Sequence, residues 1–268
     1  MGVLTAEHLT TGYGEQIISE NLNYTFHKGT ITSIIGPNGC GKSTFLKTLA
    51  RVLPGQNGSV LLDGKTLNQY SSKEIARELA MLAQTTEAQI DLSVFDVISF
   101  GRYPYQSGWR SLNAQDEQII QWALEMTSLT ELARTSVATL SGGQRQRVWI
   151  AMALVQDTDI VILDEPTTYL DPAHQLEVLN VLQKINQTKG KTIIMTIHDI
   201  NLAARFSDGI IAMKAGEILK EGLPETVITA PVLREVFNID AEIIFHEQLQ
   251  RPLLLSYEVL KAEERYAN

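Results

Sequence analysis

Apolar and polar residues alternate along the first part of the chain in a pattern that predicts strands. From Val3 to Phe26 the alternation runs on both sides of a turn at Gly12-Tyr-Gly14, which predicts antiparallel strands. The mainly apolar run Ile31–Ile35 predicts a buried strand. Ser43–Leu53 then places apolar residues at helical spacing, and Pro54-Gly55 ends this predicted helix. The chain therefore opens as paired strands followed by a strand–loop–helix unit.

The middle of the chain has the spacing of short helices. Ser71, followed by Glu74, forms the capping-box pattern that opens a helix. Two further helices are predicted near Ser93–Phe100 and from Asn113 to Met126, joined by a loop over residues 101–108. These helices predict an inserted helical subdomain over residues 84–140.

After residue 140, helices and strands alternate. The predicted order is Ser141–Leu154 (helix), Ile160–Leu163 (strand), Asp171–Lys189 (helix), Thr192–Ile197 (strand), and Ile210–Met213 with Glu217–Lys220 (hairpin), and Ser59–Asp63 is an earlier short strand. Long apolar strands that alternate with helices favour a parallel sheet covered on both faces. The last stretch, about 45 residues, predicts only short helix and strand fragments. We expect one domain over 1–268, with a core from residues 1–83 and 141–268.

Composition narrows the class of protein. The 268 residues carry a formal net charge of −9, and the 22 basic residues are scattered, so we expect no nucleic-acid partner. No apolar run approaches the roughly 18 residues of a membrane span, and no signal peptide is evident. Cys40 is the only cysteine, which excludes an internal disulfide and suits a reducing cytosol.

The strand–loop–helix unit carries a phosphate-loop pattern. Gly36, Gly41, Lys42 and Ser43 fit G-x-x-x-x-G-K-[ST], and a predicted strand and helix flank them as this motif requires. Glycines let backbone N–H groups face phosphates, and the lysine adds a positive charge. The predicted nucleotide-binding residues are Gly36, Pro37, Asn38, Gly39, Cys40, Gly41, Lys42, Ser43 and Thr44. The alternative, a glycine-rich turn before a helix, leaves the Lys-Ser pair unexplained.

Two acidic residues follow the apolar strand Ile160–Leu163. Asp164, at the end of a parallel strand, is placed to hold Mg²⁺ together with the Ser43 hydroxyl. Glu165 can act as general base toward an attacking water. The alternative is a solvated acidic pair at a strand end, which the phosphate loop upstream disfavours.

A second glycine-bearing segment, Ser141-Gly142-Gly143-Gln144, precedes the helix that runs to Leu154. The Ser hydroxyl, the N–H groups of the helix start and the positive end of its dipole would form a second anion-binding surface. The alternative is an ordinary N-cap. Two phosphate-binding helix starts in one chain suggest that they serve different nucleotides across a dimer.

In this order the motifs resemble those of ABC (ATP-binding cassette) ATPases. Residues 140–144 resemble the signature motif, and Gly36–Thr44 and Ile160–Glu165 resemble Walker A and B. The resemblance covers residues 3 to about 220. It implies an α/β P-loop NTPase fold, with a mostly parallel RecA-like core sheet, an N-terminal antiparallel β subdomain and an inserted α-helical subdomain.

The resemblance also assigns four outlying residues. Tyr13 matches the aromatic residue that stacks on adenine, and Gln84 matches the glutamine that touches Mg²⁺ and water. Asp171 matches the D-loop, and His198 matches the switch histidine near the γ-phosphate. Each assignment is weak by itself. The ordinary alternatives are an aromatic residue in a turn, a surface glutamine, a helix N-cap and a histidine at a strand end.

The resemblance implies a mechanism and partners. Two copies would pair head to tail, with ATP and Mg²⁺ between Lys42 of one copy and Ser141–Gln144 of the other. Hydrolysis of ATP would drive a separate transmembrane permease, and indirectly an extracytoplasmic substrate-binding protein, from the cytoplasmic face of the membrane. Residues 84–140 would carry the motion to the permease.

Several segments narrow the resemblance to one subfamily. Gly101–Pro104, Thr167–Leu179 and His198–Arg205 are similar to cassettes of iron–siderophore, haem and vitamin B12 uptake. Val236–Ile239 and Pro252–Leu255 resemble iron(III)–siderophore importers most. A sugar or amino-acid importer and a non-transport ABC ATPase are the alternatives. A long C-terminal domain would favour the sugar type, and coiled-coil insertions, tandem cassettes or a basic surface would favour the non-transport type.

Overall fold

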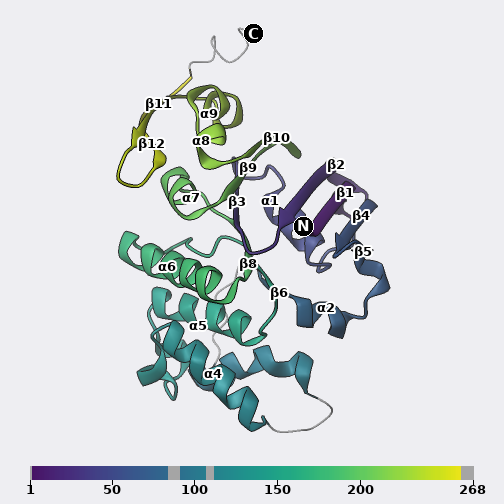
Figure 1. Ribbon diagram of the computed structural model, residues 1–268, viewed down its shortest axis with the longest axis vertical. Coiled ribbons are helices and arrows are strands. Elements are labelled where there is room, and N and C mark those ends of the chain that lie inside the picture. The colour runs from purple at the N-terminus through teal and green to yellow at the C-terminus, as the bar shows by residue number, and fades with distance from the viewer. Residues whose placement is uncertain (1, 84–90, 107–111, 261–268) are drawn as a thin grey trace. The chain divides into compact units, whose positions relative to one another are not determined.

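The computed structural model describes residues 2–83, 91–106 and 112–260, shown as ribbon in Figure 1. The chain forms two compact units. The first unit combines Met1–Thr66 with Ile194–Asn268, and the second unit is Leu67–Ile193. The boundary near residue 194 falls within β8 (Thr192–Thr196). The functional division expected at residues 84 and 140 stays a prediction.

An antiparallel sheet begins the first unit. Its strands are β1 (Gly2–Tyr13), β2 (Gln16–His27), β4 (Asn57–Leu62) and β5 (Lys65–Thr66), in the order β2-β1-β4-β5. The pairing of β1 with β2 around the turn at residues 14–15 confirms the predicted antiparallel pair. One face of this sheet is apolar because the alternating residues Leu4, Phe26 and Leu62 are buried.

The strand–loop–helix unit packs against this sheet. β3 (Ile31–Ile35) is fully buried, and α1 (Lys42–Leu49) contacts β1, with the rings of Phe26 and Phe45 6.4 Å apart. The helix was predicted to continue to Leu53, but it ends at Leu49. Arg51 takes a left-handed backbone with φ 54°, and the N–H groups of residues 52 and 53 bond back to the Lys47 carbonyl. Apolar residues at helical spacing therefore continue beyond the end of the helix.

The rest of the first unit follows β8. β9 (Gly209–Lys214) lies parallel to β3, and β10 (Glu217–Gly222) returns antiparallel to β9, as the hairpin prediction required. The helices are α7 (Ile200–Phe206), α8 (Pro224–Val227) and α9 (Ala230–Phe237). The C-terminal part is more regular than predicted, because β11 (Ile239–His246) and β12 (Arg251–Val259) form a long antiparallel hairpin.

Helices dominate the second unit. They are α2 (Ser72–Glu78), α3 (Val94–Ser99), α4 (Ala114–Met126), α5 (Gly142–Val155) and α6 (Pro172–Lys189), with the short 3₁₀ helices η1 (Leu67–Gln69), η2 (Phe100–Tyr105), η3 (Thr130–Leu132) and η4 (Val137–Thr139). Figure 1 shows α4 and α5 side by side. With α3 they enclose an apolar core that includes Val97, Ile120 and Val148. The helices predicted near Ser93–Phe100 and from Asn113 to Met126 are therefore confirmed as α3 and α4.

The second unit also contains a strand that the sequence pattern did not reveal. β6 (Leu79–Leu82) follows α2 without a turn and pairs in parallel with β7 (Ile160–Leu163). The segment after α3, predicted as a loop over residues 101–108, forms η2 as far as Tyr105. Both parallel pairs, β3–β9 and β6–β7, agree with the predicted α/β class.

Candidate functional site

The phosphate loop lies between β3 and α1 in the first unit. Gly41 is the N-cap of α1, with φ 105°, and no side chain caps this helix start. Helix-start N–H groups without a side-chain acceptor, together with the helix dipole, suit an anionic ligand. The local structure is therefore the one that the motif predicted.

Lys42 is folded over the loop that it follows. Its Nζ donates to the carbonyl oxygens of Gly36 at 2.8 Å and Pro37 at 2.9 Å, and its side chain is buried. An ammonium group costs free energy to bury unless polar groups surround it. The two carbonyls hold the charge at the centre of the loop, where phosphate oxygens would meet it.

Two glycines of the loop have no room for a side chain. A Cβ on Gly36, whose φ is 152°, would lie 2.2 Å from the Met213 carbonyl oxygen. A Cβ on Gly41 would lie 2.8 Å from the Ser19 hydroxyl. Behind the loop, the Gly216 N–H donates to the Cys40 carbonyl at 3.0 Å. The loop is thus fixed from behind by the β9–β10 turn and by β2, which fits a preformed phosphate cradle.

Cys40 is buried inside this loop. Its Sγ lies 3.9 Å from Lys42 Nζ. Burial raises the pKa of the thiol, an effect that the nearby ammonium only partly offsets. The thiol therefore stays protonated near neutral pH, which disfavours a role as nucleophile.

The other two predicted residues of the first unit are exposed. Tyr13 ends β1 with 48% of its surface exposed, so its ring is accessible for stacking. His198 follows β8, where the Ile197 N–H donates to the Ile34 carbonyl at 3.2 Å. Since Ile34 is two residues before Gly36, His198 lies at the edge of the strands from which the phosphate loop leaves.

The acidic pair of the second unit follows β7. Asp164 is buried, and its backbone N–H donates to the Leu82 carbonyl at 2.9 Å. Glu165 has φ 54°, a left-handed conformation that is rare for a residue with a side chain. The Thr168 hydroxyl donates to Glu165 Oε2 at 3.0 Å. The carboxylate of the predicted base is therefore held in one orientation by the turn that follows it.

Ser43 and Asp164 are the predicted Mg²⁺ ligands among the described residues, and their joint role stays a prediction. They offer a hydroxyl and a carboxylate oxygen, the donors that Mg²⁺ takes beside phosphate oxygens and water. Within residues 2–83, 91–106 and 112–260, no three His, Cys, Asp or Glu side chains form a metal-binding group. A metal held largely through substrate phosphates needs no such group. Gln84, also predicted to contact this metal and to act in catalysis, lies outside the described residues.

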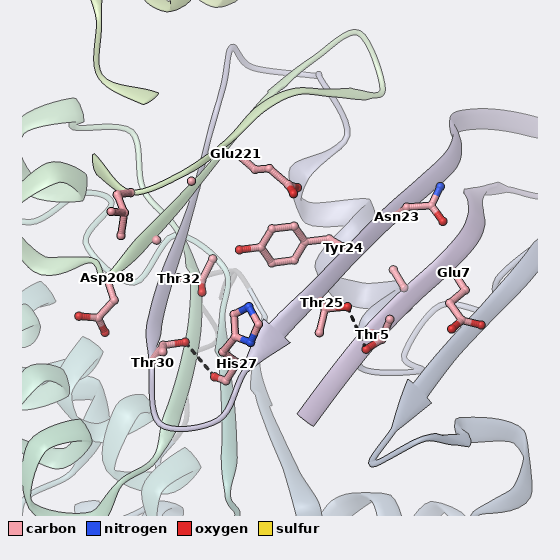
Figure 2. A pocket seen from close by; sticks show the side chains of 14 residues that line it. Thr5, Glu7, Asn23, Tyr24, Thr25, His27, Thr30, Thr32, Asp208 and Glu221 are labelled. Atoms are coloured by element: carbon pink, nitrogen blue, oxygen red, sulfur yellow. Dashed lines mark hydrogen bonds between the residues drawn. The ribbon is translucent and has the colours of Figure 1, made fainter. Parts of the chain in front are cut away.

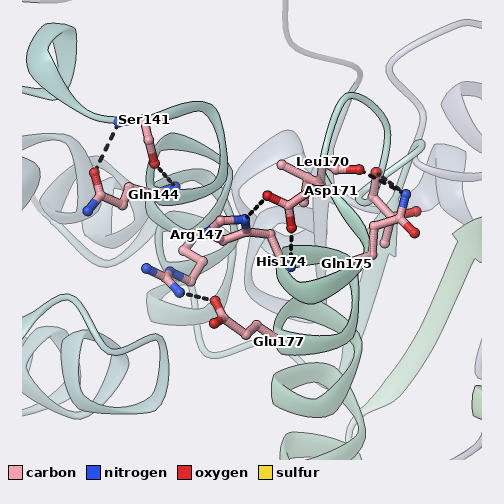
Figure 3. Close-up of polar contacts among 9 residues, drawn as sticks. Ser141, Gln144, Arg147, Leu170, Asp171, His174, Gln175 and Glu177 are labelled. Atoms are coloured by element: carbon pink, nitrogen blue, oxygen red, sulfur yellow. Dashed lines mark hydrogen bonds and ion pairs between the residues drawn. The ribbon is translucent and has the colours of Figure 1, made fainter.

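The signature segment starts α5 with a complete capping box. Ser141 Oγ accepts from the Gln144 N–H at 3.2 Å, and Gln144 Oε1 accepts from the Ser141 N–H at 3.0 Å (Figure 3). Gly142 is exposed, with open space where its Cβ would be. The segment is thus both the ordinary N-cap of the alternative interpretation and a helix start with accessible backbone. The anion-binding role of Ser141–Gln144 stays a prediction.

Asp171 caps α6, as predicted. Its Oδ1 accepts from the His174 N–H at 3.0 Å, and its Oδ2 lies 2.7 Å from His174 Nδ1. These two contacts lower the pKa of the Asp171 carboxyl. The predicted residues of the second unit, from Asp164 to Asp171 and at the start of α5, thus belong to one connected region.

Sequence reasoning missed the residues that hold this region together. The Gln146 amide donates to the Pro166 carbonyl at 3.0 Å, and the Gln175 amide donates to the Leu170 carbonyl at 3.1 Å. His174 lies within Thr167–Leu179, a segment that the sequence marks only by its family resemblance. Its place three residues after an Asp N-cap, the usual site of a capping partner, was the available signal.

A hollow of about 820 Å³ in the first unit contains none of the predicted site residues. Figure 2 shows it around Tyr24, Thr32 and Glu221, with Glu7 and Asp208 also in its lining. Burial raises the pKa of Glu221, and burial followed by the charge of Glu221 raises that of Tyr24. Because its ionisable lining is mainly acidic and shares no residue with the phosphate loop, we do not assign the nucleotide to it.

Comparison with known proteins identifies the family to which this arrangement belongs. Residues 19–168 match the family model described as ABC transporter. The chain belongs to the ABC transporter family. Membership of this family supports the predicted binding of ATP. The roles of the acidic pair and of the signature segment stay predictions.

Two curated relatives cover nearly the whole chain. It is 51% identical over 264 residues to the iron(3+)-hydroxamate import ATP-binding protein FhuC of Bacillus subtilis (strain 168), covering 98% of each protein. It is 46% identical over 254 residues to the petrobactin import ATP-binding protein FpuD of Bacillus anthracis, covering 95% of this chain and 93% of the relative.

A solved dimeric structure of a bacterial ABC transporter cassette has the same fold. It matches with a TM-score of 0.72 at 29% identity, covering 82% of this chain and 98% of that cassette. Within the part of the cassette that the structure describes, no helix is both long and apolar enough to cross a membrane.

Proposed function

We propose that this ABC ATPase energises the uptake of an iron(III)–siderophore through a separate membrane permease. The observation that carries the proposal is the similarity, at 51% and 46% identity over 93% or more of each protein, to ATP-binding proteins named for import of iron(3+)-hydroxamate and of petrobactin. Importer cassettes for haem, vitamin B12 or another metal chelate are the nearest alternatives. A non-transport ABC ATPase is the more distant alternative.

The proposed chemistry assigns a role to each part of the site. The N–H groups of Gly36–Thr44 and the Lys42 ammonium bind the phosphates, and Tyr13 stacks on adenine. Glu165, oriented by Thr168, accepts a proton from the attacking water. His198 stabilises charge near the γ-phosphate. When bound at Ser43, Asp164 and Gln84, Mg²⁺ supplies positive charge beside the phosphate oxygens.

The proposed assembly is a pair of cassettes on the cytoplasmic face of the membrane. Each ATP would lie between the phosphate loop of one copy and Ser141–Gln144 of the other, as the family resemblance implies. The dimeric state of a similar solved cassette supports the pairing of two copies. Phosphate charge shared by two helix starts joins the copies only while the γ-phosphate is present. A permease, and indirectly an extracytoplasmic substrate-binding protein, would complete the importer.

Glu165→Gln tests the catalytic part of the proposal. Loss of the base should lower kcat about 10²–10⁴-fold while ATP binding persists, so the variant should accumulate as an ATP-bound dimer. Turnover by coupled assay and dimerisation by light scattering measure this. Glu131→Gln, at an exposed position of the second unit, is the matched control. Turnover like that of the wild type in Glu165→Gln would remove Glu165 from the role of base.

Uptake of radiolabelled iron tests the substrate. Cells that lack this chain should fail to take up an iron(III)–hydroxamate siderophore, and the wild-type gene should restore uptake while Glu165→Gln should not. Parallel assays with labelled haem and cobalamin separate the alternatives. Restored haem or cobalamin uptake without restored siderophore uptake would contradict the substrate class. Co-purification with ribosomes or DNA instead of a membrane permease would contradict transport.

A further inference from the structure

The start of α5 and the start of α6 contact each other through His174. A Cβ built on Gly143 would lie 2.7 Å from Cδ2 and 2.9 Å from Cγ of the His174 ring. Real Cβ contacts are essentially never this short, so only a glycine admits the ring against the α5 backbone. One turn further along both helices, Arg147 forms an ion pair with Glu177 (Figure 3). The second residue of α5 is therefore covered by a side chain of α6.

The same ring holds the loop that precedes α6. His174 Nδ1 lies 2.7 Å from Asp171 Oδ2, and the His174 N–H donates to Oδ1 at 3.0 Å. Because an ionised carboxylate only accepts hydrogen bonds, Nδ1 carries the proton in this contact. His174 thus donates to the Asp171 carboxylate from both its backbone N–H and its ring Nδ1, while the ring lies against Gly143.

Asp171 is in turn connected to Glu165 by a short segment with several anchors. Gln175, one turn into α6, donates to the Leu170 carbonyl at 3.1 Å. On the other side, Gln146 of α5 donates to the Pro166 carbonyl at 3.0 Å. The Thr168 hydroxyl holds Glu165 itself. Residues 165–171 are therefore fixed between the two helices rather than free to move alone.

We propose that His174 is a positioning residue that makes the signature segment, residues 141–144, and the base-bearing segment, residues 165–171, move as one body. In the proposed dimer the first segment of a chain serves its neighbour's ATP, and the second serves its own. A shift at one nucleotide would thereby be passed to the other through the His174 ring. This consequence rests on the proposed function, whereas the mechanical link itself does not.

Three substitutions at position 174 separate the two contacts of the ring. His174→Ala removes both the donor and the bulk on Gly143. His174→Leu keeps bulk on Gly143 but removes the donor to Asp171, and His174→Asn keeps an N–H donor on Cγ, where Nδ1 of the histidine is attached. Gln175→Ala is the matched control, because Gln175 anchors residues 165–171, whereas the three atoms nearest a Cβ on Gly143 all belong to His174.

Amide hydrogen exchange of the full chain without nucleotide tests the link independently of ATPase activity. His174→Ala should raise exchange in both segments, 141–147 and 165–171, while His174→Asn should keep both close to wild type. Gln175→Ala should raise exchange only in residues 165–171. If His174→Ala raises exchange only in the first turn of α6, or if His174→Asn does not keep the protection, the proposal is wrong.

Steady-state kinetics provide the second readout. His174→Ala should lower kcat about tenfold, the size of one charge-assisted hydrogen bond, with KM for ATP within about twofold of the wild type. His174→Asn should keep most of kcat, and His174→Leu should not. Equal losses of kcat, ATP affinity and melting temperature in all three variants would mean that His174 only stabilises the fold, which would contradict the positioning role. An inactive wild type beside the expected exchange pattern would contradict only the proposed function.

Discussion

Replacing Arg102 with methionine should destabilise the second unit more than any surface substitution. Arg102 Nε donates to Asp116 Oδ1 at 2.7 Å, and Nη1 donates to the Val155 carbonyl at 2.8 Å. The guanidinium also lies 4.0 Å from the centroid of the Tyr105 ring. Both charged side chains are buried, with 5% and 4% of their surfaces exposed. The pair fastens η2 to α4 and to the end of α5.

The magnitude follows from what the substitution leaves behind. Asp116 also accepts from the Asn113 N–H at 3.1 Å, so its carboxylate stays in place at the start of α4. Removing one partner of a buried ion pair leaves an uncompensated charge and costs about 3–5 kcal/mol. At about 2–4 °C per kcal/mol for a chain of this size, Arg102→Met should lower the melting temperature by roughly 6–20 °C.

A double-mutant cycle checks the cause. Arg102→Met combined with Asp116→Asn removes both charges and keeps the acceptor for Asn113, so it should recover more than half of the loss. Thermal and urea unfolding followed by circular dichroism measure all four proteins. Arg234→Met is the control, because its ion pair with Asp240 at 3.0 Å is exposed and should contribute at most about 1 kcal/mol.

Two results would refute this reasoning. One is a loss for Arg102→Met no larger than that for Arg234→Met, which would mean that the buried charge is hydrated. The other is a double variant whose loss equals the sum of the single losses, which would mean that the two side chains do not interact.

The remaining predictions concern two groups with shifted pKa values. The Cys40 thiol should react with Ellman's reagent at pH 8 only after unfolding, because burial raises its pKa; stoichiometric labelling of the native protein would contradict this. Burial also raises the pKa of Glu221, so its ionisation opposes folding as pH rises above the ordinary glutamate value. Glu221→Gln should therefore raise the melting temperature at pH 7 but not at pH 4, with Glu217→Gln as the control, and an equal effect at both pH values would show that charge is not the cause.

Local patterns in the sequence were sufficient for most helix ends. The capping box at Ser71 and the helix starts at Asn113, Ser141 and Asp171 appear as predicted. Gly190 follows the predicted helix end at Lys189 and takes the left-handed conformation that glycine favours after a helix. These features depend on residues three or four apart, which the sequence displays directly.

Patterns failed where contacts with distant residues decide the structure. β6 is a strand because Leu79–Leu82 pairs with β7, about 80 residues later. α1 stops at Leu49, although apolar spacing continues to Leu53, because the chain turns back at Arg51. A strand edge or a chain reversal has no local period, so the sequence alone could not place either of them.

The sequence by itself determined the chemistry of this protein: a phosphate loop, an acidic pair after an apolar strand, and a second glycine-bearing helix start, in the order of an ABC cassette. Each of these motifs consists of particular residue types at short spacings, so the sequence alone displays it. Only the tertiary structure showed what fixes these motifs in place. His174 on Gly143 and Arg102 with Asp116 join positions 31 and 14 residues apart. Such contacts arise from packing and leave no periodic trace in the chain.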